Sequence, residues 1–275
     1  MNIEKITISN DFMFGYVMSD TKRCKAFLEQ LLDIRIDHIE YLEKQKALDS
    51  RIDARSVRLD IYVQDSTTVY DCEMQTVSGA GLPKRSRYYQ GQIDMILINK
   101  GESYSKLKKS LVIFICAFDP FGRDRYIYTF ENICREDNSI YLKDEAEKVF
   151  INTRGTAGEV SDEFRELMEY FNDRKTAEKC RNSLVKEIDR AVEAAKNSDE
   201  WRHDYMTWQM YGNEKYEQGI EQGMQKGMQK GIEKGKTEGT LSTLWNLFNN
   251  GSISLSVAAE QAGMSEAAFL RTRHE

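Results

Sequence analysis

The chain has 275 residues, of which 40% are hydrophobic, 11% aromatic and 31% charged, and its formal net charge at pH 7 is −6. This length is enough for one α/β domain with a sizeable core and a smaller appendage. The opening residues lack the basic and apolar regions of a secretory signal, and no apolar run reaches the length of a membrane span. We therefore expect a cytoplasmic protein without a membrane partner.

The spacing of cysteine and histidine argues against a structural zinc site. Structural zinc sites use closely spaced ligands such as CxxC pairs, whereas here five cysteines and three histidines are scattered. They are Cys24, Cys72, Cys116, Cys134, Cys180, His38, His203 and His274. We expect Cys72 and Cys116 to be reduced core thiols, and we expect no zinc and no organic cofactor.

Hydrophobic periodicity predicts an alternation of helices and strands in the first half of the chain. Three helices are expected at about Asp11–Met18, Lys22–Leu32 and Lys84–Ile98. Four strands are expected at Val57–Gln64, Thr68–Thr76, Leu111–Phe118 and Arg125–Glu131. The helix between the second and third strands forms a crossover, so those two strands should be parallel. The predicted fold class is α/β with a mixed central sheet.

The second half of the chain is helical and charged. Helices are expected at Ser161–Phe171 and Lys175–Lys196. Beyond Trp201 the sequence repeats, with glycine at every fourth position in EQGIEQGMQKGMQKGIEKGKTEG. Glycines disfavour an isolated helix, but each of the first four is followed by an apolar residue. We favour a helix that forms on self-association over a flexible spacer.

A short helical tail comes after the repeat, at Leu241–Phe248 and Leu255–Leu270, with a turn at Gly263. The pattern resembles a helix-turn-helix. Its second helix is poor in basic residues, so a small packing hairpin is favoured over sequence-specific DNA binding, which stays open.

The segment from Val57 to Val77 predicts a β-hairpin. A four-residue turn at Asp65–Thr68 pairs Gln64 with Val69, and strict alternation then gives one apolar face in both arms. The apolar pairs are Leu59 with Met74, Ile61 with Cys72, and Val63 with Tyr70. On the other face Asp60 lies opposite Glu73, and Arg58 lies opposite Gln75.

Two opposed carboxylates repel each other unless a cation lies nearby. For Asp60 and Glu73 that cation is either Arg58, which would make the pair a structural feature, or a divalent metal. Mg²⁺ prefers one or two carboxylates together with water and phosphate oxygens, which these residues would leave room for. Spacing alone does not decide between the two.

The segment from Gly81 to Ser110 is basic in a chain that is acidic overall. It holds seven basic residues against Asp94 and Glu102, namely Lys84, Arg85, Arg87, Lys100, Lys106, Lys108 and Lys109. A local basic surface suits phosphate binding, while the plainer interpretation is a solvated helix and loop.

Asp60 on one strand and Glu73-x-Gln75 on the next resemble the D…(E)xK core of PD-(D/E)XK nucleases. The resemblance extends to the recombination-promoting nuclease family, whose members are often labelled transposases. It rests on NDFMFGYVM, LDIYVQD…VYDCEMQ, KRSRYYQGQIDMILINKGESYSKL, SLVIFICAF and the glycine repeat, in that order. It implies a restriction-endonuclease-like sheet flanked by helices, with a helical C-terminal extension.

The resemblance also implies site residues. Asp60 and Glu73 would bind Mg²⁺, for which Mn²⁺ could substitute, and Gln75 stands where the superfamily has its water-activating lysine. An amide can position water but cannot supply charge or take a proton, so a nearby base such as Lys84 would help. Asp11 matches an acidic position of the family and would join the catalytic residues by contributing indirectly to the metal site. DNA contacts are expected from Lys84, Arg85, Arg87, Tyr88 and Gln90, while one or both of Tyr88 and Tyr89 should pack in the core.

The resemblance covers about Asn10 to Gly239, and together with the change of composition after Thr156 it gives a nuclease core at residues 1–156 and a helical extension of it at 157–200. Residues 201–240 form a glycine-periodic linker or oligomerisation segment, and 241–275 a helix-turn-helix-like tail. The activity implied is magnesium-dependent DNA endonuclease cleavage of low sequence specificity in the bacterial cell interior, linked to recombination or mobile elements. The alternatives are a catalytically weak or inactive DNA-binding regulator that oligomerises through its tail, and an oligomeric scaffold.

Overall fold

The structure is a computed structural model, and it describes residues 3–41, 61–79 and 81–272. It divides into two compact units, Met1–Tyr205 and Met206–Glu275. The strands are β1 (Glu40–Tyr41), β2 (Ile61–Gln64), β3 (Thr68–Gln75), β4 (Lys109–Cys116), β5 (Ile127–Phe130) and β6 (Ala146–Asn152). The α-helices are α1 (Asp11–Val17), α2 (Thr21–Leu32), α3 (Leu82–Leu97), α4 (Asp162–Phe171), α5 (Ser183–Lys196), α6 (Asp199–Asn249), α7 (Leu255–Gln261) and α8 (Glu266–Arg271). Short 3-10 helices are η1 (Ile3–Lys5), η2 (Tyr104–Lys106) and η3 (Ala177–Lys179).

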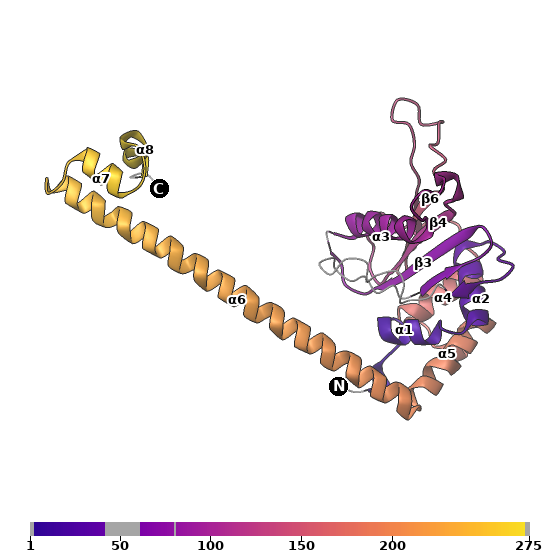
Figure 1. The fold of residues 1–275 in the computed structure, drawn as a ribbon. Coiled ribbons are helices and arrows are strands. Elements are labelled where there is room, and N and C mark those ends of the chain that lie inside the picture. The colour runs from indigo at the N-terminus through magenta and orange to yellow at the C-terminus, as the bar shows by residue number, and fades with distance from the viewer. Residues whose placement is uncertain (1–2, 42–60, 80, 273–275) are drawn as a thin grey trace. The chain divides into compact units, whose positions relative to one another are not determined.

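The first unit is built on a mixed six-stranded sheet in the order β1-β2-β3-β4-β6-β5. β3, β4 and β6 run parallel at its centre, and β2 and β5 pair antiparallel to them. The predicted parallel pairing of β3 with β4 is confirmed. The α3 crossover covers one side of the sheet, and α1, α2, α4 and α5 cover the other (Figure 1). The predicted fold class is therefore confirmed.

The predicted hairpin register is confirmed for the described pairs, which are Gln64 with Val69, Val63 with Tyr70, and Ile61 with Cys72. The predicted pairs of Asp60, Arg58 and Leu59 lie outside the described residues.

Side-chain caps explain where several helices begin. Asn10, Asp20, Ser161 and Asn182 each accept a hydrogen bond from a backbone N–H in the first turn of α1, α2, α4 and α5. Such caps satisfy donors that have no partner within the helix. α3 instead begins with a proline in its first turn, where the missing N–H costs nothing.

Two predictions of secondary structure were incomplete. The helix expected over Lys175–Lys196 is divided into η3 and α5, because the Glu166 carboxylate accepts hydrogen bonds from the backbone N–H groups of Arg181 and Asn182. Strand β6 was missed. It lies between β4 and β5 with Val149, Phe150 and Ile151 buried, so its sequence lacks the alternation of a half-exposed strand.

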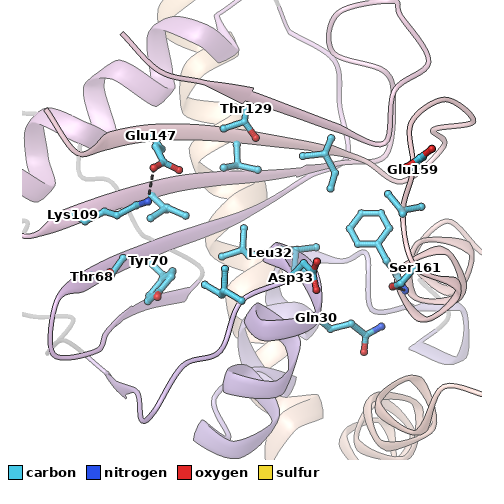
Figure 2. A pocket seen from close by; sticks show the side chains of 17 residues that line it. Gln30, Leu32, Asp33, Thr68, Tyr70, Lys109, Thr129, Glu147, Glu159 and Ser161 are labelled. Atoms are coloured by element: carbon cyan, nitrogen blue, oxygen red, sulfur yellow. Dashed lines mark hydrogen bonds and ion pairs between the residues drawn. The ribbon is translucent and has the colours of Figure 1, made fainter. Parts of the chain in front are cut away.

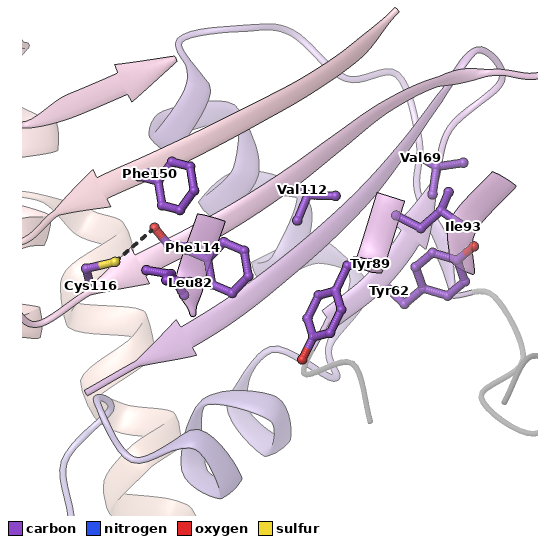
Figure 3. Close-up of a cluster of buried hydrophobic side chains, with 9 residues drawn as sticks. All are labelled: Tyr62, Val69, Leu82, Tyr89, Ile93, Val112, Phe114, Cys116 and Phe150. Atoms are coloured by element: carbon purple, nitrogen blue, oxygen red, sulfur yellow. Dashed lines mark hydrogen bonds between the residues drawn. The ribbon is translucent and has the colours of Figure 1, made fainter. Parts of the chain in front are cut away.

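The core on the α3 side is apolar and aromatic (Figure 3). It consists of Tyr62, Val69, Leu82, Tyr89, Ile93, Val112, Phe114, Cys116 and Phe150. Phe114 stacks on both Tyr89 and Phe150, with ring centroids 5.9 and 5.5 Å apart. This cluster fixes the position of α3 on the sheet, and with it the charged residues of the helix.

In the second unit α6 continues as a single helix through the glycine repeat, and its last turns pack with α7 and α8. Phe269 is fully buried there and stacks on Trp245 at 4.8 Å. The helix α6 begins at Asp199 and passes through the segment boundary expected at residue 240. The helix-turn-helix-like tail thus has its own small core.

Candidate functional site

Strand β3 carries a row of polar side chains on the side of the sheet that α3 covers. Alternation puts Asp71, Glu73 and Gln75 on this side and buries Cys72 and Met74 on the other. Glu73 is 4% exposed, and Gln75 is the last residue of the strand. Their parallel partners on β4 are Phe114 and Cys116, near its carboxyl end. Glu73 and Gln75 thus lie where open α/β sheets usually bind ligands.

Arg85 on α3 reaches down to Glu73. Its Nη2 lies 3.3 Å from Glu73 Oε2 in an ion pair. The guanidinium carbon lies 4.9 Å from the ring centroid of Phe114 and 5.3 Å from that of Tyr89, which is a cation–π arrangement. Burial raises the pKa of the Cys116 thiol to about 12, and the nearby charge of Arg85 opposes that rise. The positive charge of Arg85 therefore lies beside the buried carboxylate of Glu73 near the end of β3.

The Gln75 amide is held by the backbone that comes after it. Its Nε2 donates to the Val77 carbonyl at 2.5 Å, and its own backbone carbonyl accepts from Ala117 N at 2.9 Å. With the amide nitrogen engaged in this way, the oxygen is the atom with which Gln75 can accept a hydrogen bond from water.

A second carboxylate on the same row, Asp71, was not predicted from the sequence. Asp71 is fully buried and pairs with Tyr62 across β2 and β3. Burial raises the pKa of the Tyr62 hydroxyl, and the charges of Asp71 and Asp94 raise it further. The alternation Asp71-x-Glu73-x-Gln75 was the signal that could have shown it.

The outer side of α3 carries the exposed members of the predicted DNA-binding set. Lys84 and Arg87 are exposed, and Tyr88 is 41% exposed. Tyr89 faces the sheet at 7% exposure, so the expectation that at least one of the two tyrosines packs in the core is confirmed. Gln90 is also 7% exposed and donates to Ser110 Oγ at 2.6 Å, which places it inside the fold.

Three other basic residues of this segment contact acidic or polar groups. Lys106 pairs with Glu102, and Lys109 pairs with Glu147 on β6. Lys108 donates to the Gln64 side chain and to the Asp65 carbonyl, at 3.1 and 3.0 Å. Lys84 and Arg87, the exposed cations of α3, are therefore a part of the basic segment from Gly81 to Ser110.

Asp11 is placed in a different environment from Glu73. It is exposed in the first turn of α1, and its carboxylate accepts a hydrogen bond from Phe12 N at 2.9 Å. Its charge helps to raise the pKa of Tyr205, for which burial is the larger cause. The neighbouring Phe12 ring packs against Trp201 and Tyr205. The described contacts of Asp11 are thus with the start of α1 and of α6.

A cavity of about 310 Å³ lies on the opposite side of the sheet from Glu73 (Figure 2). Its walls include Leu31, Leu111, Val149 and Phe164, and the Lys109–Glu147 ion pair stands at its edge. Since Glu73 and Gln75 do not line it, this cavity is separate from the candidate active site.

The family model for PD-(D/E)XK nuclease family transposases matches residues 8–222. The chain belongs to this family. A comparison with curated proteins gave no match, and a comparison with solved structures gave none either. Membership in this family supports a role as a nuclease or in mobile elements. It also implies that the substrate is DNA. The match spans the sheet, the α3 crossover and the first part of the glycine repeat.

PD-(D/E)XK nucleases generally use divalent metals, and the described residues fit this requirement in part. Glu73 offers one buried carboxylate and Gln75 one amide oxygen on the same side of the sheet, both of them oxygen ligands of the kind that Mg²⁺ prefers. Asp60, the other predicted ligand, lies outside the described residues, as does Arg58. Within the described part of the chain, no group of three or more His, Cys, Asp or Glu residues could hold a metal.

Within the described ranges, helices sufficiently long and apolar to span a membrane are absent.

Proposed function

We propose that the chain is a metal-dependent endonuclease that hydrolyses DNA phosphodiester bonds with little sequence preference, in recombination or in the movement of mobile elements. The observation that carries this proposal is the placement of Glu73 and Gln75 on one side of β3 at its carboxyl end, in a member of a nuclease family. Mg²⁺ is the proposed metal, with Mn²⁺ able to replace it.

In this proposal Asp60 and Glu73 hold the metal, which when bound lowers the pKa of water and stabilises charge on the phosphate. Gln75 orients the attacking water by accepting a hydrogen bond through its amide oxygen, since its nitrogen is engaged with Val77. Lys84 on α3 is the proposed basic group that assists with proton transfer.

The outer side of α3 supports low sequence specificity. Lys84 and Arg87 are exposed cations suited to phosphate oxygens, and Arg87 can contact two of them at once. Contacts with phosphates fix the position of DNA but carry no information on sequence. We propose that DNA lies along this side, with Tyr88 contacting sugar or base.

Plasmid cleavage tests the proposal. Supercoiled plasmid is incubated with purified protein and Mg²⁺ or Mn²⁺, beside the variants Asp60→Ala and Glu73→Ala. The matched control is Glu163→Ala, which removes an exposed carboxylate on the opposite side of the sheet. We expect nicking that needs metal, persists in the control and is lost in both site variants. Cleavage that survives in both site variants would show that the site is wrong.

The second candidate function is a DNA-binding regulator without catalysis, and Gln75 favours it. An amide supplies neither the positive charge nor the proton transfer of the lysine it replaces. Intact plasmid, together with DNA binding by a folded protein, would support this candidate.

We also propose that the chain self-associates through α6. Ile220, Met224, Met228 and Ile232 come directly after the repeated glycines and are 47 to 71% exposed within the described unit. Glycine costs about 1 kcal/mol per residue in a helix relative to alanine, so this helix needs stabilisation from outside its own sequence. A second copy of the chain could supply it by covering the exposed apolar residues.

A further inference from the structure

The Arg85–Glu73 ion pair involves the carboxylate that the proposed function makes a metal ligand, so the role assigned to Arg85 rests on that function. Glu73 is almost fully buried, whereas the Arg85 side chain is 36% exposed. A buried carboxylate needs a positive neighbour, and a guanidinium is charged at every pH at which proteins fold. Arg85 supplies such a charge from α3, on the same side of the sheet as Glu73.

Arg85 also has access to solvent while it pairs with Glu73, because its side chain is 36% exposed. Its guanidinium lies over the rings of Phe114 and Tyr89, and both rings are fixed in the apolar core of Figure 3. When the guanidinium turns from Glu73 toward solvent, the apolar stem of Arg85 can take its place over these rings.

We propose that Arg85 is a positioning residue that occupies the Glu73 carboxylate before metal binds and turns to a DNA phosphate when a divalent metal takes that carboxylate. The metal and the guanidinium compete for the same oxygen atoms, and two cations so close together repel each other. Arg85 thus lowers metal affinity in the absence of DNA. A DNA phosphate that accepts Arg85 removes the competitor, so DNA and metal bind cooperatively.

Calorimetric titration of the full chain with Mn²⁺ alone, at one pH and without DNA, tests this competition. Arg85→Met keeps the apolar stem over Phe114 and Tyr89 but removes the charge, and Arg85→Gln keeps a hydrogen-bond donor to Glu73. We expect both to bind Mn²⁺ at least tenfold more tightly than the unchanged chain. Arg85→Lys retains the charge but not the planar guanidinium that lies over the two rings, so its Mn²⁺ affinity should lie between those of the unchanged chain and Arg85→Met.

The matched control is Arg165→Met, which breaks a surface ion pair with Asp162 on α4, across the sheet. It should leave Mn²⁺ affinity unchanged. The unfolding temperature without metal gives a second readout, because Arg85→Met leaves Glu73 without this cation and should unfold at a lower temperature that Mn²⁺ restores. A purely structural role would lower the unfolding temperature but would not tighten Mn²⁺ binding.

The failures of the two proposals are distinguishable. If the unchanged chain binds Mn²⁺ and both uncharged variants bind it equally or more weakly, the competition proposal is wrong and the nuclease proposal stands. If neither the unchanged folded chain nor the uncharged variants bind Mn²⁺, both proposals fail, and Arg85 and Glu73 form an ordinary buried ion pair. If Arg85→Met does not fold, Arg85→Gln decides the outcome.

Discussion

Tyr62 and Asp71 lie directly opposite each other in the β2–β3 ladder, and both are buried beneath α3. Asp71 precedes Glu73 by two residues, a distance of about 7 Å along a strand. The pair therefore lies away from the carboxyl end of β3, and the charge of Asp94 on α3 acts on it. This position suits a residue that stabilises the sheet rather than one that binds metal.

We predict that Asp71→Asn and Glu73→Gln affect different quantities. Asp71→Asn should lower the free energy of unfolding by about 1–3 kcal/mol, because it disturbs a buried polar group, and should leave Mn²⁺ affinity within about threefold. Glu73→Gln should abolish Mn²⁺ binding. Chemical denaturation and calorimetric titration measure the two quantities. Loss of Mn²⁺ binding in a folded Asp71→Asn protein would make Asp71 a ligand and contradict the prediction.

The sequence predicted the hairpin well because two independent constraints agreed. The Asp65–Thr68 turn and the apolar alternation each require the same register, which β2 and β3 adopt. The sequence did not show which residues of β3 belong to the site, since Asp71, Glu73 and Gln75 alternate equally regularly along the strand. Where each of these residues lies beneath α3 depends on packing between distant segments. The pairing of Arg85 with Glu73 and the burial of Gln90 against Ser110 could not be predicted from the sequence for the same reason.

Replacing Gln75 should separate a positioning role from the lysine role of the superfamily. Gln75→Ala removes the amide and should slow single-turnover cleavage by about 100-fold or more, as loss of a group that positions water does. Gln75→Lys supplies a charged donor at the same place and should stay within about tenfold of the unchanged chain. A rate in Gln75→Ala equal to that of the unchanged chain would show that Gln75 does not contact the attacking water.

The exposed and buried parts of α3 should respond differently in DNA binding. Lys84→Ala and Arg87→Ala should each weaken binding and reduce the slope of log affinity against log salt by about 1, since each removes one phosphate contact. Gln90→Ala should leave that slope unchanged and instead destabilise the fold, because Gln90 donates to Ser110. Fluorescence anisotropy at several salt concentrations measures the slopes. A reduced slope in Gln90→Ala alone would move the DNA surface to the other side of the helix.

Asp94 should make stability depend on pH. Burial raises the pKa of its carboxyl group, the Gln90 hydrogen bond and the Lys148 charge oppose the rise, and Asp144 adds to it. A carboxyl group whose pKa is raised by folding contributes fully to stability at pH values below its unfolded pKa of about 3.9. That contribution is lost as the pH rises through the pKa of the folded state. Asp94→Asn should therefore raise the free energy of unfolding at pH 7, by about 0.5–1 kcal/mol after allowance for solvent screening.

The gain from Asp94→Asn should shrink as the pH falls toward 4. Asp137 provides a control of opposite sign, because hydrogen bonds from Ser139 lower its pKa. Asp137→Asn should reduce stability at pH 7 and lose that effect in acid. Urea denaturation between pH 4 and pH 8 measures both variants. A loss of stability at pH 7 in Asp94→Asn would mean that the Lys148 attraction outweighs burial.

The glycines of α6 offer the sharpest test of self-association. A Cβ at Gly223 or Gly227 would meet no atom within 4 Å in the described chain, so alanine fits there without a clash. Each replacement should favour the helix by about 1 kcal/mol. If the glycines allow close approach of a second helix, the same methyl groups obstruct that approach. We expect the double variant to be more helical at low concentration yet to associate at least tenfold more weakly.

Circular dichroism and analytical ultracentrifugation of the full chain measure helicity and association. Gln225→Ala with Gln229→Ala is the matched control, because it adds helix propensity on the same helix without filling a glycine position. Met224→Ser with Met228→Ser should weaken association by removing apolar side chains that are 71% and 70% exposed in the described chain. Tighter association of the glycine variant would show that helix stability limits assembly and that the glycines lie outside the contact. Unchanged association in both the glycine and the methionine variants would remove α6 from the interface.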